Sequence, residues 1–310
     1  MKKLFALLLC AAMLANFAAC GSKTTPDPTQ PPMPATTPAT QLAAPTSAPT
    51  QAPTEPTAPP AAMGETTLVD TDSVTFTVTG VEHNDHLGMQ LQVQCVNKTG
   101  RALLFSWDMV SVCGYMYDPM WSAEIAAGMA ANTAVELDTY ALEAMGINSV
   151  DEITFTLRVV DSENWMEKPI VEQAFTIYPT GLSAETVERP QRNTADAPVV
   201  IGDDYTRFVI EAGEEDASSY TLHVYLENNT DRNLMYTWDQ VSVNGLAVDS
   251  FWAMSVAAGK KACSEINFAH SDLEHKGIQT VETVEFTLLV SDYDNWDTPN
   301  LLEETYTYHP

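Results

Sequence analysis

Two short acidic segments carry the residues whose types and spacing are most typical of metal binding. Carboxylates and amides stand close together in residues 161–165 and again in residues 292–297. Their oxygens could converge on Ca²⁺, which takes about six to eight oxygen ligands. The candidate ligands are Asp161 and Glu163 in the first segment, and Asp292, Asp294, Asn295 and Asp297 in the second.

The alternative for both acidic segments is an Asx-rich turn, in which the side chains bond the turn's own backbone. Trp165 and Trp296 would then cap one end of the fold. The sequence favours the turn, because no glycine follows at the position that an EF-hand loop requires. Under the calcium hypothesis, the second segment holds the fuller site.

Trp121 and Trp252 are the candidates for ligand stacking. Each lies in an irregular segment beside an acidic residue, rather than in an alternating strand. An exposed indole at such a place can stack on the face of a sugar. Large aromatic side chains more often close the edge of a core, so the sequence favours burial and keeps sugar binding as the alternative.

The sequence shows no catalytic arrangement. It has no Gly-x-Ser-x-Gly, Walker loop, His-Glu-x-x-His or Cys-x-x-Cys motif. Residues 83–86, His-Asn-Asp-His, could offer metal ligands, but a polar hairpin tip explains them equally well. Cys95 is expected in a strand's apolar face and Cys113 at an exposed turn, with a bond between them left open. We therefore expect a non-enzymatic protein without a cofactor, calcium excepted.

The chain contains an internal repeat. SWDMVSVCG at Ser106–Gly114 returns as TWDQVSVNG at Thr237–Gly245, and a shift of 131 positions aligns Val78–Pro179 with Val209–Pro310 without a gap. Almost half of the positions in residues 91–129 are identical to their partners, and all six tryptophans pair. Self-similarity on this scale predicts two copies of one domain of about 115 residues each.

Each copy is expected to fold as short antiparallel strands. Leu91, Val93 and Cys95 alternate with glutamines, as in a strand with one buried face. Asn-rich turns at 97–100 and 228–231 are expected to supply positive φ angles. Asn244-Gly245 predicts a hairpin, and a helical turn is expected before Gly146 and before Gly277. The later strands are expected at residues 131–138, 152–160 and 171–178 and at their counterparts 262–269, 283–291 and 302–309.

About seven such strands in each copy predict an all-β fold with two tandem β-sandwiches. Trp107 and Trp238, each on a predicted core strand, resemble the core tryptophan of immunoglobulin-like domains. This resemblance implies an immunoglobulin-like architecture, and implies no activity.

The N-terminus reads as an export signal. Lys2 and Lys3 precede an apolar run, and Phe17-Ala18-Ala19-Cys20 resembles the lipobox of bacterial lipoproteins. The resemblance implies that residues 1–19 are removed and that Cys20 carries lipid, which anchors the chain to the outer face of the bacterial cell membrane. Residues 20–63 hold most of the 19 prolines and are expected to form an extended, disordered stalk.

The charged residues of the chain restrict the classes of partner that it can bind. The chain has 42 Asp and Glu against 14 Lys and Arg, a formal net charge of −28. Such a surface repels the phosphates of nucleic acid, which excludes nucleic-acid binding. We expect two repeats, at 64–180 and 197–310, joined by a polar linker at 181–196. The expected function is a non-enzymatic surface module for a glycan, a wall polymer or a protein; the alternative is a structural spacer or envelope-assembly protein.

Overall fold

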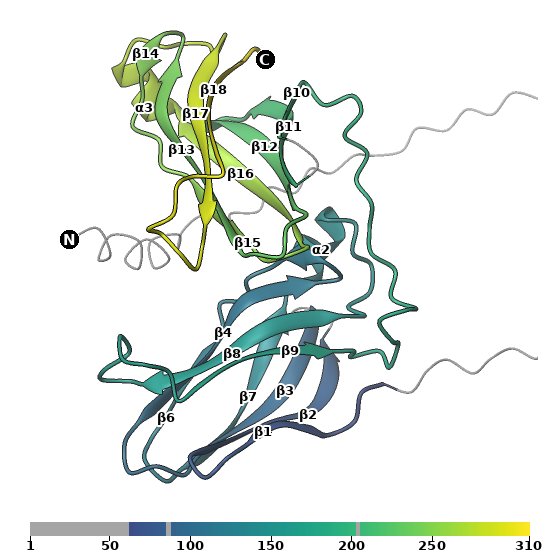
Figure 1. Cartoon of the computed structure of the whole chain (residues 1–310). Coiled ribbons are helices and arrows are strands. Elements are labelled where there is room, and N and C mark those ends of the chain that lie inside the picture. Colours follow the sequence, from purple (N-terminus) through teal and green to yellow (C-terminus); the bar gives the residue numbers. More distant parts are fainter. Residues whose placement is uncertain (1–61, 85–87, 203–204) are drawn as a thin grey trace, which may run out of the picture. The chain divides into compact units, whose positions relative to one another are not determined.

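The computed structural model describes residues 62–84, 88–202 and 205–310 (Figure 1). The predicted signal, the lipid site Cys20 and almost all of the predicted stalk lie outside the described residues. The described chain is built almost entirely from β-strands, which confirms the all-β prediction. None of its helices is long and apolar enough to cross a membrane.

The first repeat, residues 64–180, contains two sheets packed on a common core. One sheet has the order β1-β2-β3-β7, and in the other β8 lies between β4 and β9, while the short strands β5 and β6 also pair with β4. The bounds are β1 (Thr66–Asp70), β2 (Val74–Asn84), β3 (Gly88–Asn97), β4 (Leu103–Val112), β5 (Tyr115–Met116), β6 (Ser122–Ile125), β7 (Ala130–Leu137), β8 (Ile153–Asp161) and β9 (Val171–Ile177).

The second repeat, residues 197–310, has the same strand order. β10-β11-β12-β16 correspond to β1-β2-β3-β7, and β14-β13-β17-β18 correspond to β5-β4-β8-β9, with β15 again pairing the central strand. The bounds are β10 (Val199–Gly202), β11 (Thr206–Glu215), β12 (Ser219–Asn228), β13 (Leu234–Val243), β14 (Leu246–Ala247), β15 (Ala253–Val256), β16 (Lys261–Ala269), β17 (Val284–Asp292) and β18 (Leu302–Tyr308).

This strand order is that of an immunoglobulin-like sandwich. Strands β2, β3 and β7 take the places of A, B and E, and β5, β4, β8 and β9 those of C′, C, F and G. The chain changes sheet between β3 and β4, between β6 and β7 and again between β7 and β8, as Greek-key connections require. The immunoglobulin-like prediction is therefore confirmed by topology as well as by class.

The predicted alternation of buried and more exposed side chains is present along β3. Along β3 every second side chain is buried, and Leu91, Val93 and Cys95 are fully enclosed. Trp107 stacks on Phe155 with ring centroids 3.9 Å apart. Trp238 lies among aromatic rings in the second repeat in the same way, so the repeated nine-residue segments supply core strands.

The asparagine turns form for a different reason from the one predicted. Neither Asn97 nor Asn228 has a positive φ; both are buried, and their side chains tie the loop together. The Asn228 amide donates to the carbonyls of Arg232 at 2.7 Å and Val256 at 2.8 Å, and its oxygen accepts from the Thr230 backbone at 3.0 Å. Asn97 makes the same set of bonds. The asparagine is required for its amide, not for its backbone freedom.

We expect Asn228→Ala to lower the free energy of unfolding by about 2–4 kcal/mol, because it leaves buried carbonyls without donors. Urea denaturation followed by tryptophan fluorescence measures this change. Asn300→Ala is the matched control, since the Asn300 amide bonds only the exposed Glu303 carboxylate among the described contacts. Equal effects of the two substitutions would contradict the proposed role.

The hairpin and helix predictions are confirmed. Asn244 and Gly245 have φ angles of 52° and 76°, which a tight turn between two strands requires. The helices α2 (Thr139–Ala144) and α3 (His270–His275) are followed by Gly146 at φ 83° and Gly277 at φ 79°.

The two repeats touch directly and belong to one compact unit. The backbone N–H of Lys261 on β16 donates to the carbonyl of Gly114 at 3.0 Å. Tyr115 on β5 is buried against Tyr225 on β12, with ring centroids 6.3 Å apart. Met116 belongs to the hydrophobic core of the second repeat. One hairpin edge of the first repeat is therefore buried on the second.

The predicted linker, residues 181–196, is bonded along its length. Arg189 pairs with the buried carboxylate of Glu152, and the carbonyl of Pro190 accepts from the Tyr115 hydroxyl at 3.2 Å. Arg192 bonds Glu211 on β11 at 2.5 Å. The polar composition of this segment predicted a linker, and in the structure these ion pairs and hydrogen bonds hold it against both repeats.

Candidate ligand sites

The acidic segments form turns fixed from within. One oxygen of Asp292 accepts backbone N–H bonds from Asp294 at 3.0 Å and Asn295 at 3.1 Å. Its other oxygen lies 3.5 Å from the guanidinium of Arg232. Asp161 makes the same turn and pairs with Arg101 at 2.8 Å. Hydrogen bonds from the backbone, foremost from Glu163, lower the pKa of the Asp161 carboxyl.

These bonds satisfy the oxygens that a calcium ion would need. Asp294 instead accepts from the Asn233 amide at 3.0 Å, and Glu163 and Asp297 are exposed. In the described part of the chain, no three carboxylate, imidazole or thiol groups are gathered to hold a metal. The contacts favour the turn over the calcium hypothesis, and the arginine already supplies the positive charge.

The structure places Trp121 and Trp252 in the two cores. They are 9% and 3% exposed, and Trp252 packs edge-on against Phe208 at 5.7 Å. The Trp252 indole N–H donates to the Ser264 hydroxyl at 3.1 Å. Neither ring has a free face for a sugar, so the favoured core location is correct and the stacking alternative fails.

The exposed tryptophans are the other equivalent pair. Trp165 is 42% exposed and Trp296 is 53% exposed; both follow the Asp–Arg turns described above. We call residues 161–170 and 292–301 the Trp loops. Under the Asx-turn alternative these rings were expected to cap one end of the fold. Their positions outside the strands did not show that they are more exposed than Trp121 and Trp252. The Asx turn beside each of them is the sequence signal that marks an exposed loop.

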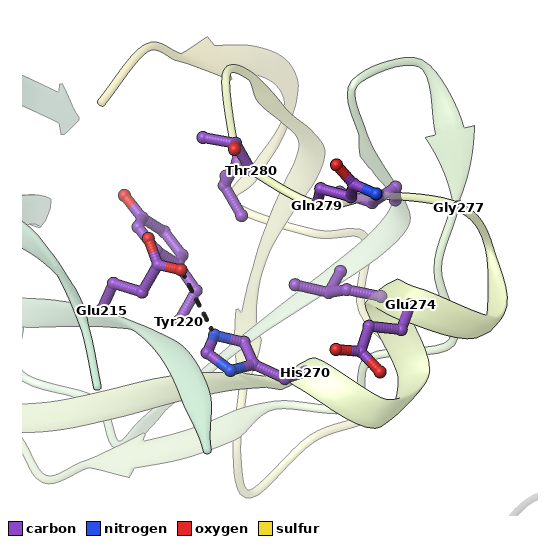
Figure 2. Close-up of a pocket in the computed structure, with 10 residues that line it drawn as sticks. Glu215, Tyr220, His270, Glu274, Gly277, Gln279 and Thr280 are labelled. Carbon is purple, nitrogen blue, oxygen red and sulfur yellow. Dashed lines mark ion pairs between the residues drawn. The ribbon is translucent and has the colours of Figure 1, made fainter. Parts of the chain in front are cut away.

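A pocket of about 430 Å³ opens at one end of the second repeat, and we call it the second-repeat pocket. It lies between the ends of β11 and β12, helix α3 and the loop after that helix. Figure 2 shows Glu215, Tyr220 and His270 on one side, Glu274 on α3 and Gln279 with Thr280 on the loop. Leu273, Ile278 and Val281 give it an apolar floor.

The hairpin residue Asn244 positions the loop that borders this pocket. Its amide donates to the Thr280 carbonyl at 2.7 Å, and its oxygen accepts from the backbone of Glu282 at 2.8 Å and Thr283 at 3.0 Å. The asparagine that makes the hairpin turn therefore also fixes one wall. In the first repeat, Cys113 takes this place and its thiol reaches the Ser149 carbonyl at 3.4 Å.

The second-repeat pocket is acidic. Glu215 lies 3.5 Å from the His270 imidazole, as the dashed line in Figure 2 marks, and Glu274 is exposed on α3. The lining described for it contains no lysine or arginine. Burial raises the pKa of the Tyr220 hydroxyl. The pocket offers negative charge above a hydrophobic floor.

The first repeat has an equivalent pocket of about 300 Å³, the first-repeat pocket. Its floor repeats the second in Leu142, Ile147 and Val150. Its walls differ, because Met89 and Thr139 stand where the second repeat has Tyr220 and His270. The duplicated fold kept the cavity and changed the chemistry around it.

Three cysteines lie in the described part of the chain. Cys95, Cys113 and Cys263 are all free thiols. Burial raises the pKa of the Cys95 thiol to about 12, as expected for a packing residue. Cys113 is buried, not exposed as predicted, because the contact between the repeats covers its turn. Burial likewise raises its pKa.

Comparisons with known proteins give no relative that identifies the chain. No family model matches it, and no curated protein matches it. Among solved structures, a chain from the Salmonella enterica SafA pilin–SafB chaperone complex is 11% identical with a TM-score of 0.23, covering 78% of this chain and 98% of that one. The Amycolatopsis orientalis exo-chitosanase CsxA is 11% identical with a TM-score of 0.24, covering 74% of this chain and 26% of that one.

Proposed function

We propose that this protein is an extracytoplasmic lipoprotein, anchored through Cys20, which acts as a non-enzymatic binding or interaction module. The Trp loops would carry the contact to a glycan, a wall polymer or a surface protein. The alternative of a spacer or envelope-assembly protein without a small-molecule ligand needs no exposed indoles. This distinction makes the Trp loops the place to test the proposal.

One observation carries this function: both repeats present an exposed tryptophan at the same place. A duplicated fold keeps its core residues because packing demands them. Trp165 and Trp296 contribute little to either core, yet both remain while Met166 has become Asp297 beside them. Tryptophan is enriched among the residues that dominate binding energy at interfaces, so retained exposure favours a contact with a partner.

Each Trp loop is held at its first residue by hydrogen bonds and an ion pair. Each begins at an aspartate held by an arginine and by two backbone N–H bonds. In the second repeat Tyr293 lies 6.1 Å from Trp296, which adds a second ring. A preorganised aromatic surface spends less binding energy on ordering itself.

The test is binding of the mature chain to an array of wall polymers, host-type glycans and surface-protein extracts, in calcium and again in EDTA. For any ligand detected, we expect the double variant Trp165→Ala, Trp296→Ala to weaken binding at least about tenfold, which corresponds to about 1.4 kcal/mol. Signals should be equal in calcium and EDTA, since Asp161 and Asp292 are already paired with arginines and with backbone N–H groups.

Tyr140→Ala is the matched control, because Tyr140 is an aromatic residue 73% exposed whose counterpart is Ser271. It should leave binding unchanged. A ligand that binds the double variant as tightly as the parent would overturn the role of the Trp loops. Absence of every ligand would favour the spacer.

A further inference from the structure

We propose that the second-repeat pocket is a separate binding site for a small organic cation, an ammonium group on a compact apolar body. This site is independent of the Trp loops. It rests on three features of the pocket: its size, the charge of its walls and the aromatic ring that stands beside an apolar floor.

The size suits a small ligand. Ligand pockets in proteins usually have volumes of about 300–1,000 Å³, and this one measures about 430 Å³. Leu273, Ile278 and Val281 are buried beneath it, so the pocket removes apolar surface of a ligand from water. A fully hydrated metal ion would gain nothing from this floor.

The negative charge of the pocket walls favours a positively charged ligand. Glu215 and Glu274 approach the pocket from β11 and α3 (Figure 2), and no arginine or lysine in its described lining opposes them. Glu215 meets only the imidazole of His270 at 3.5 Å among the ion pairs described. An ammonium group placed here gains two carboxylate partners that remain open to solvent.

The aromatic wall favours an organic cation over a neutral ligand. Tyr220 is largely buried but borders the pocket, and a tyrosine ring attracts an ammonium group that lies within about 6 Å of its centroid. In the first-repeat pocket Met89 replaces this ring and Thr139 replaces His270. The same molecule therefore contains a cavity with equivalent floor residues that lacks the aromatic wall and the ion pair.

The local sequence of α3 agrees with a specialised second pocket. The first helix is capped by Asp138, whose carboxylate accepts from the backbone of Tyr140 and Ala141. The equivalent residue before α3 is Ala269, which makes no side-chain cap. The second repeat therefore carries His270 at the start of a helix that lacks the side-chain cap of its counterpart.

The test is calorimetric titration of the mature chain with choline and with 3,3-dimethylbutan-1-ol, which has the same shape without the charge. We expect saturable binding of choline to one site per chain, and binding of the neutral alcohol at least about tenfold weaker. Glu215→Gln and Glu274→Gln should each weaken choline by about two- to fivefold. Tyr220→Met, which installs the residue of the first repeat, should weaken it by a similar factor.

Glu143→Gln is the matched control, because Glu143 occupies in the first-repeat pocket the position of Glu274. It should leave choline binding within about twofold of the parent. Equal binding of choline and the neutral alcohol, equal loss in the control, or no saturable binding below about 50 mM would each overturn the proposal. Circular dichroism of every variant distinguishes lost binding from lost fold. Loss of the Trp-loop ligand would leave this site unaffected.

Discussion

Trp252→Ala is expected to lower the free energy of unfolding by about 3–5 kcal/mol, the usual cost of removing a large buried aromatic side chain. The ring lies between Phe208 at 5.7 Å and Trp238 at 6.2 Å. Its loss opens a cavity in the second core and removes the donor to Ser264. Chemical denaturation followed by far-ultraviolet circular dichroism measures the change.

Trp296→Ala is the control of the same chemistry, since that ring is 53% exposed. We expect its stability to stay within about 0.5 kcal/mol of the parent. The pair of variants thus separates the tryptophan that holds the fold from the one available to a partner. Comparable losses in both would contradict this assignment.

Tyr225→Gln is expected to uncouple the two repeats. Tyr225 belongs to the second repeat, yet its fully buried ring packs into the core of the first and beside Tyr115. Glutamine is the residue at the equivalent position of the first repeat, Gln94, so the sandwich itself tolerates it. We expect a loss of about 2–4 kcal/mol, and differential scanning calorimetry should resolve two unfolding transitions in place of one.

His223→Gln is the control for Tyr225→Gln, because it places the same new residue at another position of β12. His223 lies on the same strand, at the position of Gln92, and contacts Glu214 and Glu265 at the surface. It should leave a single transition with a small shift. If the two variants give the same thermogram, Tyr225 does not couple the repeats.

The fold was largely predictable because the same pattern of apolar residues, turns and tryptophans occurs in both repeats. Alternation in β3, the Asn244-Gly245 turn and the pairing of six tryptophans all reflect local chemistry that each repeat must satisfy alone. The buried contact between the repeats was not predictable in this way. The counterparts of Tyr115 and Tyr225 in the other repeat are Leu246 and Gln94. Because these residues differ, aligning the two repeats gave no sign that the tyrosines form a contact.

The candidate sites were less predictable, since periodicity does not report which rings face solvent. Trp121 and Trp165 both lie outside regular strands, but one closes a core and the other is exposed. The second-repeat pocket joins Glu215, Tyr220 and His270, which are separated in sequence and have no counterparts of the same type. To compare the pocket walls of the two repeats, one must first know which strand residues lie next to each other, and this requires the strand register.

The contact between the repeats is made by residues that neither repeat carries at its own equivalent, free surface. It joins two unlike surfaces, and a head-to-tail contact of that kind grows into an open filament when every unit carries both surfaces. Here the second repeat presents Leu246 and Ala247 in place of Tyr115 and Met116, and the first presents Gln94 in place of Tyr225. The two free surfaces therefore lack the aromatic residues that form the contact between the repeats, and neither can repeat that contact with the same side chains.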